Sequence, residues 1–259
     1  MKLDILYEDK YLIACIKPCG VPAQGDKTND LDMVSLVRDH IFDNSDSDEE
    51  PYVAVIHRLD KPVGGIMLFA KDKDTAAKLS DMLQDNEIVK YYQAVLTGEL
   101  PDDFGTFEDY LLTDSKTGTT RVVPKGTKGA KIAKLSYELL DEFETDDGPL
   151  SYVLVELLTG RHHQIRCQMA SHGAPIWGDQ RYNPAFSKAK DQAKKGKNMK
   201  GGSGHAPGKK GRNASDKAGI GLYFSRMEFD HPVTNEHIVL KAEPEGKAFQ
   251  AIELEEDFD

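Results

Sequence analysis

Val53-Ala-Val-Ile-His-Arg-Leu-Asp60-Lys-Pro-Val-Gly-Gly-Ile-Met-Leu-Phe-Ala-Lys71 places two charged groups beside a turn between two apolar runs. The runs Val53 to Ile56 and Ile66 to Ala70 predict buried strands, and the proline and glycines between them predict the turn. Arg58 and Asp60 therefore lie at the edge of a core, where a charge is costly unless it is paired or used. Their spacing is as compatible with a structural ion pair as with a functional site.

Similar patterns predict the other elements. We expect strands at 11–17, 90–97, 134–140, 151–158, 221–229 and 237–241, and helices at 32–42 and 164–172. A further helix has Asp74 as its expected N-cap, with a buried stripe of Ala76, Ala77, Leu79, Met82 and Leu83. Strands and helices interleave without regular βαβ repeats, which favours an α+β fold with a mixed sheet.

The composition permits a large core without disulfide bonds or metal ions. The chain has 259 residues, of which 39% are hydrophobic, enough for one large domain or two small ones. Its three cysteines, Cys15, Cys19 and Cys167, lack the spacing of a zinc site, so we expect reduced thiols and a cytoplasmic protein. The sequence shows neither a signal peptide nor an apolar stretch of membrane-spanning length.

The charge distribution is uneven. The net charge is −11, whereas nucleic-acid-binding proteins usually carry a basic field. Residues 184–219 contain ten basic and two acidic residues with seven glycines, and we expect a flexible basic insertion there. This composition is compatible with a tolerated surface loop and with a weak contact to RNA phosphates. Binding of a polyanion would require the acidic runs at 43–50, 141–147 and 253–259 to face away from it.

The turn resembles a known signature. His57-Arg-Leu-Asp60 followed by Gly65 to Lys71 closely resembles the signature of RluA-family RNA pseudouridine synthases. Four further segments match this family in the right order: the Lys17-Pro-Cys-Gly20 turn, the Lys90-Tyr-Tyr-Gln-Ala94 strand ending at Gly98, the Gly160-Arg-His-His-Gln-Ile-Arg166 block continuing to Pro175-Ile176 and Gly178-Asp179, and the His231-Pro-Val-Thr234 turn. Five ordered matches carry far more weight than one short motif.

The resemblance implies a fold and an activity. The fold would be that of pseudouridine synthases, α+β with a mixed, largely antiparallel central sheet flanked by helices. We expect residues 1–259 to form a single catalytic domain, with no auxiliary RNA-binding domain before it. The activity would be isomerisation of specific uridines in structured rRNA or tRNA to pseudouridine, by a monomer without cofactor.

The resemblance also assigns catalytic residues. It places the carboxylate that acts on the ribose, as nucleophile or as base, on Asp60. Such a carboxylate must stay ionised in a partly dry pocket, and Arg166 is the matching cation, since a guanidinium pairs with a carboxylate bidentately. Tyr92 matches the tyrosine of the family, whose ring can stack on uracil and whose hydroxyl can move a proton. Tyr91 should point to the opposite face of the strand.

Substrate-binding residues follow from the same motifs. Arg58 is placed by resemblance to fill the gap left by an extruded base, a role that suits a stacking guanidinium. The resemblance also places His57, Arg161, His163 and Gln164 at the substrate site, and His57 is expected chiefly to brace the loop. We expect no metal at the adjacent His162 and His163, because paired helical ligands need i, i+4 spacing and a third ligand.

Two departures from the family pattern are visible. Val63-Gly64 stands where the family usually has Thr-Ser, and His162 stands where it usually has Thr. The first loses two hydroxyls next to Asp60, which we expect to loosen the loop or to alter substrate contacts. Neither departure removes Asp60, Tyr92 or Arg166.

Two alternatives remain. A catalytically silent RNA-binding relative is compatible with the acidic surface and the altered loop, although the three retained catalytic residues argue against it. A carboxylate-dependent hydrolase would require a second marked acidic motif, and the sequence offers none. We therefore expect RNA as the partner, with no membrane association.

Overall fold

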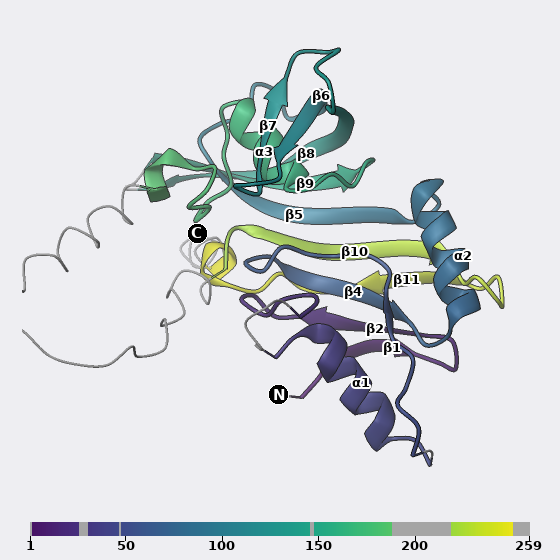
Figure 1. The fold of residues 1–259 in the computed structure, drawn as a ribbon. Coiled ribbons are helices and arrows are strands. Elements are labelled where there is room, and N and C mark those ends of the chain that lie inside the picture. Colours follow the sequence, from purple (N-terminus) through teal and green to yellow (C-terminus); the bar gives the residue numbers. More distant parts are fainter. Residues whose placement is uncertain (1, 26–30, 47, 146–147, 188–218, 251–259) are drawn as a thin grey trace, which may run out of the picture.

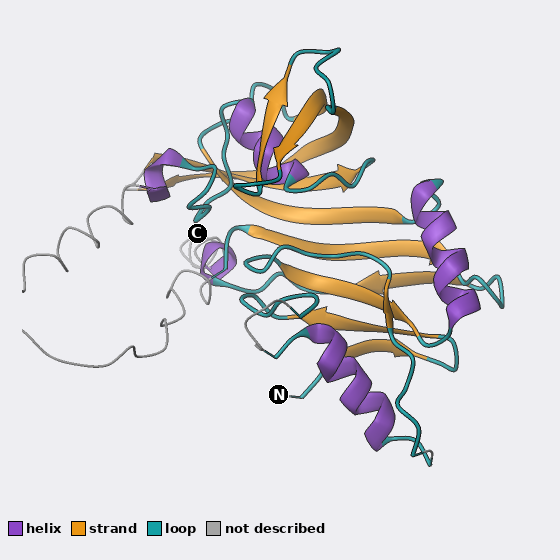
Figure 2. Ribbon diagram, in the orientation of Figure 1, coloured by secondary structure: helices purple, strands orange, loops and turns teal. Residues whose placement is uncertain are grey.

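The computed structural model describes residues 2–25, 31–46, 48–145, 148–187 and 219–250. The predicted basic insertion, except for its first few residues and Gly219, lies outside the described residues. The described strands join in one sheet, and helices pack around it (Figures 1 and 2). The elements are β1 (Ile5–Glu8), β2 (Leu12–Lys17), α1 (Met33–Asp43), β3 (Ala54–Val55), β4 (Gly64–Ala70), α2 (Lys73–Gln84), β5 (Val89–Thr97), β6 (Phe104–Asp114), β7 (Thr119–Val123), β8 (Lys131–Thr145), β9 (Gly148–Leu157), α3 (Gln164–Ser171), β10 (Leu222–Asp230) and β11 (His237–Lys241).

The sheet is mixed and largely antiparallel. Its strand order is β1-β2-β4-β10-β5-β9-β8-β6-β7, with β11 paired to β10 and β3 paired to β4. Among the described strands, β4 and β10 form the one parallel pair, through Tyr223 opposite Gly64 and Phe224 opposite Gly65. The predicted fold class, α+β with a mixed, largely antiparallel sheet flanked by helices, is confirmed.

The two strands of the opening stretch differ in extent from the prediction. Only Ala54–Val55 of the first run pairs with the sheet, whereas the second strand begins two residues early, at Gly64. All seven residues of β4 are buried, because β2, β10 and β3 pair with it and α2 packs on it. Asp60 thus lies in the loop between the short strand β3 and the central strand β4.

β6 and β7 were not predicted. β6 reads Phe-Gly-Thr-Phe-Glu-Asp-Tyr-Leu-Leu-Thr-Asp, and only Phe107 and Leu111 are buried along it. A strand near the edge of a sheet, with few buried side chains and charged or small residues between them, gives no continuous apolar run and no strict alternation. The hydrophobic pattern therefore could not identify it.

The helices confirm most of the boundaries and correct one. α1 follows its N-cap Asp32, whose Oδ1 accepts a hydrogen bond from the N–H of Ser35 at 3.1 Å. The prediction that Asp74 caps the second helix is wrong, because Asp72 has the extended backbone and accepts the Thr75 N–H at 2.8 Å. α3 lies within the predicted 164–172.

The buried side of α2 differs in part from the prediction. Thr75 and Leu79 are fully buried, with Ala76, Met82 and Leu83 packed beside them, whereas Ala77 is exposed, contrary to the prediction. α2 packs on β3 and β4, and α3 packs on β6 and β7.

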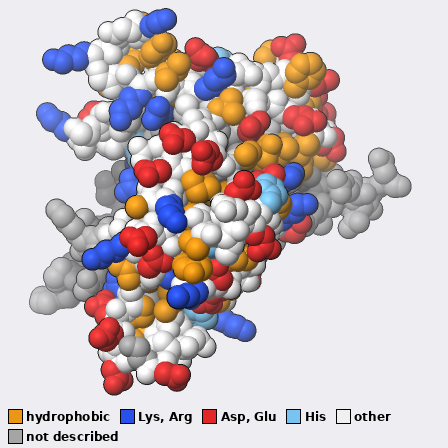
Figure 3. All heavy atoms as spheres, turned by 90° about the vertical axis from the view of Figure 1, so that its right-hand side faces the viewer, with side chains coloured by type: hydrophobic (Ala, Val, Ile, Leu, Met, Phe, Trp, Pro, Cys, Tyr) orange, Lys and Arg blue, Asp and Glu red, His pale blue; other side chains and the backbone are white. Residues whose placement is uncertain are grey.

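The surface shown in Figure 3 carries both signs of charge. Aspartate and glutamate side chains are interspersed with lysine and arginine over this face, so it is not a uniformly basic surface. Within the described residues, no helix combines the length and the apolar character needed to cross a membrane.

Gly65, the second residue of β4, shows why the start of this strand needs glycine. Its φ is +121°, and a Cβ there would lie 2.6 Å from the backbone N of Phe224 and closer still to its carbonyl oxygen. Backbone of a neighbouring strand cannot move aside as a flexible side chain can.

We predict that Gly65→Ala lowers the free energy of unfolding by about 2–4 kcal/mol, through backbone strain and overpacking. Urea denaturation followed by circular dichroism measures this loss. Gly160→Ala is the matched control, because a Cβ at Gly160 meets no atom within 4 Å. Equal stability of the two variants would contradict the prediction.

Candidate active site

The Asp60 loop is held in place by a buried lysine. Lys17, at the end of β2, is fully buried, and its Nζ donates to the carbonyl oxygens of Pro18 (3.0 Å), Val21 (2.8 Å) and Lys61 (3.3 Å). Burial lowers its pKa to about 8, an effect partly offset by the negative charge of groups that include Asp60. The N–H of Gly20 also donates to the Lys61 carbonyl at 2.7 Å, so the turn after β2 and the Asp60 loop form one unit.

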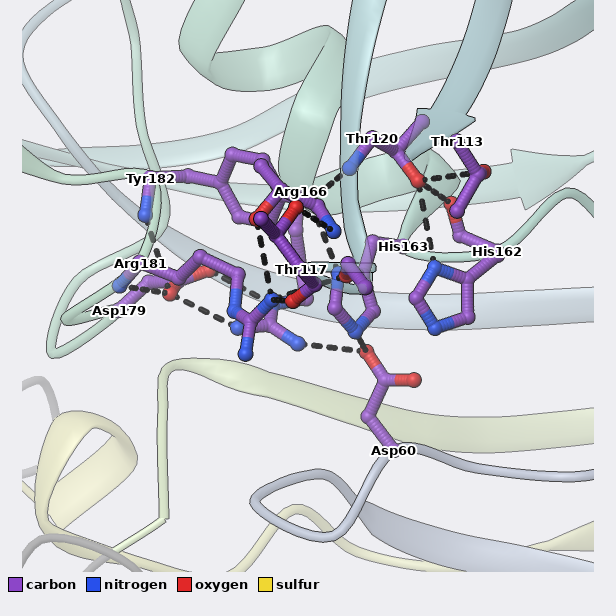
Figure 4. Close-up of polar contacts among 12 residues, drawn as sticks. Asp60, Thr113, Thr117, Thr120, His162, His163, Arg166, Asp179, Arg181 and Tyr182 are labelled. Carbon is purple, nitrogen blue, oxygen red and sulfur yellow. Dashed lines mark hydrogen bonds and ion pairs between the residues drawn. The ribbon is translucent and has the colours of Figure 1, made fainter. Parts of the chain in front are cut away.

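Arg166 connects two carboxylates. Its Nη1 lies 2.6 Å from Oδ2 of Asp60, while its Nε and Nη2 bind Oδ2 and Oδ1 of Asp179 at 2.7 and 2.9 Å (Figure 4). Burial alone would lower the pKa of Arg166, but Asp179 and Asp60 outweigh burial and raise it. Arg166 in turn overcomes the burial of Asp179 and holds the pKa of that carboxyl below its usual value. The guanidinium is therefore a permanent cation in a fixed orientation.

His163 and Tyr182 complete the surroundings of Asp60. His163 precedes α3 in a left-handed conformation, with φ of 52° and ψ of 28°, which turns its ring toward Asp60. Its Nε2 lies 3.5 Å from Oδ2 of Asp60, and its Nδ1 lies 2.8 Å from the hydroxyl of Tyr182. Burial lowers the pKa of His163 to about 4, which Asp60 only partly opposes. The Tyr182 ring also lies under the Arg166 guanidinium, 5.3 Å from its Cζ.

A cavity of about 860 Å³ opens beside these groups. Asp60, Tyr92, Arg166 and the five predicted substrate residues Arg58, His57, Arg161, His163 and Gln164 all line it. The structure thus brings together side chains that are more than 100 residues apart in sequence. A smaller cavity of about 270 Å³, lined in part by Lys61, Gln180 and Arg181, adjoins the other side of Asp60 and Arg166.

Tyr92 lies on the inner face of β5. Its ring stacks on Phe224 of β10, with centroids 4.5 Å apart and planes 10° apart. Burial, and secondarily the charge of Asp60, raises its pKa, so the phenol keeps its proton at neutral pH. Tyr91 is less buried and packs against the guanidinium of Arg226, in agreement with the expected alternation of the strand.

Arg58 and His57 differ in exposure and in their contacts. Arg58 is exposed at the rim of the cavity. The ring of His57 contacts Phe224 edge-on, and its Nε2 accepts the N–H of Leu68 at 3.2 Å. Burial, together with the charge of Lys90, lowers the pKa of His57 to about 4, so this ring stays neutral. Its contacts fit the bracing role expected for it.

Arg161 and Gln164 are occupied by hydrogen bonds within the protein. The Gln164 side-chain oxygen accepts from Thr159 Oγ1 (2.7 Å) and from the N–H of Arg161 (3.0 Å), and its amide donates to the carbonyl of Lys134 (3.1 Å). Nε of Arg161 donates to the carbonyl of Ile132 at 2.9 Å. These bonds fix the segment before α3, and both side chains still border the cavity.

Four residues of this site received no role from the sequence. Asp179 belongs to the quoted Gly178-Asp179 motif, so its position, though not its partner, was marked. Lys17 was marked in the same way by its turn. Tyr182 and Phe224 lie in no motif, and only the packing of the loop after α3 and the β5–β10 pairing bring them to the site.

Tyr223 explains the departure at Gly64. A Cβ at Gly64 would lie 2.8 Å from Cε2 of Tyr223 and 3.2 Å from Sγ of Cys19. The serine usual in the family therefore has no room here, and Val63 is buried where a threonine would be usual. The loop packs against an aromatic ring in place of the two hydroxyls.

The sequence offered no third metal ligand beside His162 and His163, but the structure places Asp60 next to them. One ligand atom from each of Asp60, His162 and His163 lies within 4.8 Å of the others. Helical i, i+4 spacing does not apply to these residues, because both histidines precede the first residue of α3 and His163 has a left-handed backbone.

We predict that Asp179→Asn lowers the free energy of unfolding by roughly 3 kcal/mol, because it leaves the buried Arg166 with an incomplete counter-charge. Chemical denaturation monitored by fluorescence checks the value. The exposed pair of Arg38 and Glu50, 3.0 Å apart, gives the control, and Glu50→Gln should cost less than about 1 kcal/mol. A similar small loss in both variants would show that the buried pair adds little.

The chain matches known proteins over most of its length. The profile of the family described as RNA pseudouridylate synthase matches residues 11–171. The chain is 30% identical over 247 residues to the Uncharacterized RNA pseudouridine synthase YlyB of Bacillus subtilis, a match that covers 93% of this chain and 69% of that protein. It is 29% identical over 255 residues to tRNA pseudouridine synthase C of Vibrio parahaemolyticus, covering 93% and 90% respectively.

The fold is also found in a solved structure. Human RNA Pseudouridylate Synthase Domain Containing 4 superposes with a TM-score of 0.68 at 21% identity, covering 97% of this chain and 92% of that one. Because the family profile spans more than half of the residues, the chain belongs to the RNA pseudouridylate synthase family, in the RluA group whose five motifs it carries.

Proposed function

We propose that the chain isomerises specific uridines of structured rRNA or tRNA to pseudouridine, with Asp60 as the group that acts on the ribose. The family is one of RNA-modifying isomerases, and the full-length likeness to a tRNA enzyme makes tRNA the first substrate to test. The observation that carries the role of Asp60 is its ion pair with Arg166, at 2.6 Å, beside a cavity of about 860 Å³.

The reaction breaks the bond between N1 of uracil and C1′ of ribose and forms a bond between C5 and C1′. The C5 proton is released, and N1 gains a proton. Asp60 would either attack C1′ or remove the C2′ proton, and both routes need an ionised carboxylate. Arg166 favours that ionised form, and Asp179 keeps the guanidinium from turning away.

The cavity fits an extruded nucleotide. Flipping a base out of folded RNA costs a few kcal/mol, which contacts in the protein must offset. Tyr92 offers an aromatic ring at the wall of the cavity, with its opposite face supported by Phe224. Arg58 at the rim is placed to stack or to bind phosphate where the base has left.

The hydroxyl of Tyr92 can act as a proton donor. Its raised pKa keeps it protonated near neutral pH, so it can supply a proton but does not start as a base. His163, Arg161 and Gln164 border the same cavity and would contact the nucleotide or keep the loop rigid.

We also propose that residues 1–259 act as a single catalytic domain and as a cytoplasmic monomer without cofactor. One sheet joins all the described strands, and the three cysteines are free thiols. A silent RNA-binding protein would have no need for the arrangement of Asp60, Arg166 and Asp179.

The first test is a map of pseudouridines in total RNA from cells with the gene intact, deleted, or carrying Asp60→Ala. At least one site in rRNA or tRNA should disappear in both altered strains, because no other group at this position can act on the ribose. Asp39→Ala, an exposed carboxylate on α1, is the control and should retain every site. An unchanged map in the deletion and Asp60→Ala strains would overturn the proposal.

The second test separates the ring of Tyr92 from its hydroxyl. Tyr92→Phe keeps the stack on Phe224 and should lower kcat by about 10²-fold with little change in KM, since it removes only a proton donor. Tyr92→Leu should also raise KM. Both are measured by release of tritium from C5 of labelled RNA, and wild-type kcat in Tyr92→Phe would assign the proton transfer to another group.

A further inference from the structure

Asp60, His162 and His163 present three metal-binding groups to one opening of the catalytic cavity. His162 is exposed and His163 is half-buried, and both line the cavity with Asp60. In Figure 4 the two imidazole rings lie side by side above the Asp60 carboxylate. Their centroids are 3.8 Å apart, and one ligand atom from each of the three residues lies within 4.8 Å of the others.

The hydrogen bonds of Thr120 orient His162 for metal binding. The hydroxyl of the buried Thr120 donates to the carbonyl oxygen of His162 at 2.9 Å. A Thr120 hydroxyl that donates to this carbonyl accepts from Nδ1 of His162, 3.2 Å away, and from Oγ1 of Thr113, 2.9 Å away. In this arrangement of hydrogen bonds the ring of His162 carries a hydrogen on Nδ1, and its Nε2 is available to a metal.

His163 has an equivalent support. Its Nδ1 lies 2.8 Å from the hydroxyl oxygen of Tyr182, which also accepts the N–H of Thr120 at 2.9 Å, and its Nε2 faces Asp60 at 3.5 Å. An imidazole that binds a metal through one nitrogen usually donates from the other to such a partner, which fixes the ring. Each histidine therefore has a polar partner at Nδ1 that can hold its ring when Nε2 binds a metal.

Asp60 supplies the third ligand without losing its ion pair. Arg166 and His163 both approach Oδ2, and the contacts drawn to Asp60 in Figure 4 all end on one oxygen. The second oxygen points toward the space below His162. Two imidazoles and one carboxylate suit Zn²⁺, and a tetrahedral ion would leave its fourth position for water.

We propose that this cluster binds Zn²⁺ and that the bound ion inhibits the enzyme. The donor atoms must close to a spacing of about 3.3 Å around an ion with bonds of about 2 Å, and the exposed His162 ring can rotate to do so. The inhibition rests on the proposed role of Asp60, because the ion would occupy its free oxygen and the space that the ribose needs. The nearby positive charge of Arg166 opposes a dication and weakens zinc binding. We therefore expect the ion to bind and inhibit only when zinc is added, and not to be a resident cofactor.

The binding test uses the full chain, Zn²⁺ alone and no RNA. Competition with a chromophoric chelator should show a zinc site in the wild type whose dissociation constant is weakened at least tenfold in His162→Thr. His162→Gln is the second variant, in case the first does not fold. His172→Gln is the matched control, because His172 lies at the other end of α3, 3.1 Å from Asp109, and this variant should bind as the wild type does. Equal zinc affinity in the wild type and both His162 variants would overturn the site.

The inhibition test adds RNA. Zinc should reduce tritium release half-maximally near its dissociation constant, EDTA should restore the rate, and His162→Thr should need at least tenfold more zinc. Inhibition that is equal in the wild type and His162→Thr would overturn the inhibitory role. The binding test needs no activity, so a chain that binds zinc but modifies no RNA would contradict the proposed function and leave the metal site standing.

Discussion

The guanidinium of Arg166, held between Asp60 and Asp179, is the interaction on which the site depends. Asp179 is almost fully buried and binds the guanidinium through two hydrogen bonds, so it fixes the plane of the group. The remaining nitrogen, Nη1, donates to Asp60 at 2.6 Å, and a quarter of the Asp60 side chain stays exposed. Asp179 thus positions the guanidinium, and Asp60 remains accessible for chemistry. An arginine suits this arrangement because its planar fork can serve two acceptors at once.

A second constraint acts through the backbone. The buried ammonium of Lys17 binds three carbonyl oxygens from two segments, and one of these segments carries Asp60. A charge at full burial is costly, so the three acceptors must stay where they are for the lysine to be accommodated. The positions of Asp60 and Arg166 are therefore set by Lys17 and Asp179, which do not line the larger cavity.

Sequence patterns could predict what depends on neighbours along the chain. The strand at β5, the helices α1 and α3 and the mixed sheet follow from apolar runs and caps, and the motifs marked Asp60, Tyr92 and Arg166. What could not be predicted depends on residues distant in sequence. The partner of Arg166 is 13 residues away in an irregular loop, and Phe224 reaches Tyr92 only through strand pairing. β6 lacked an apolar run, and the N-cap of α2 was misplaced because two aspartates both precede its apolar stripe.

The position of β10 in the sheet has a consequence for biosynthesis. β10 lies between β4, which follows Asp60, and β5, which carries Tyr92, although it comes more than 120 residues after both. Until residues 222–230 leave the ribosome, the two sides of the cavity have no strand between them and Tyr92 has no ring to stack on. Because such long-range pairing is made late, a nascent chain cannot assemble the catalytic cavity ahead of its last central strand. An RNA-modifying enzyme made beside ribosomal RNA would thereby stay inactive until β10 has been made and has joined the sheet.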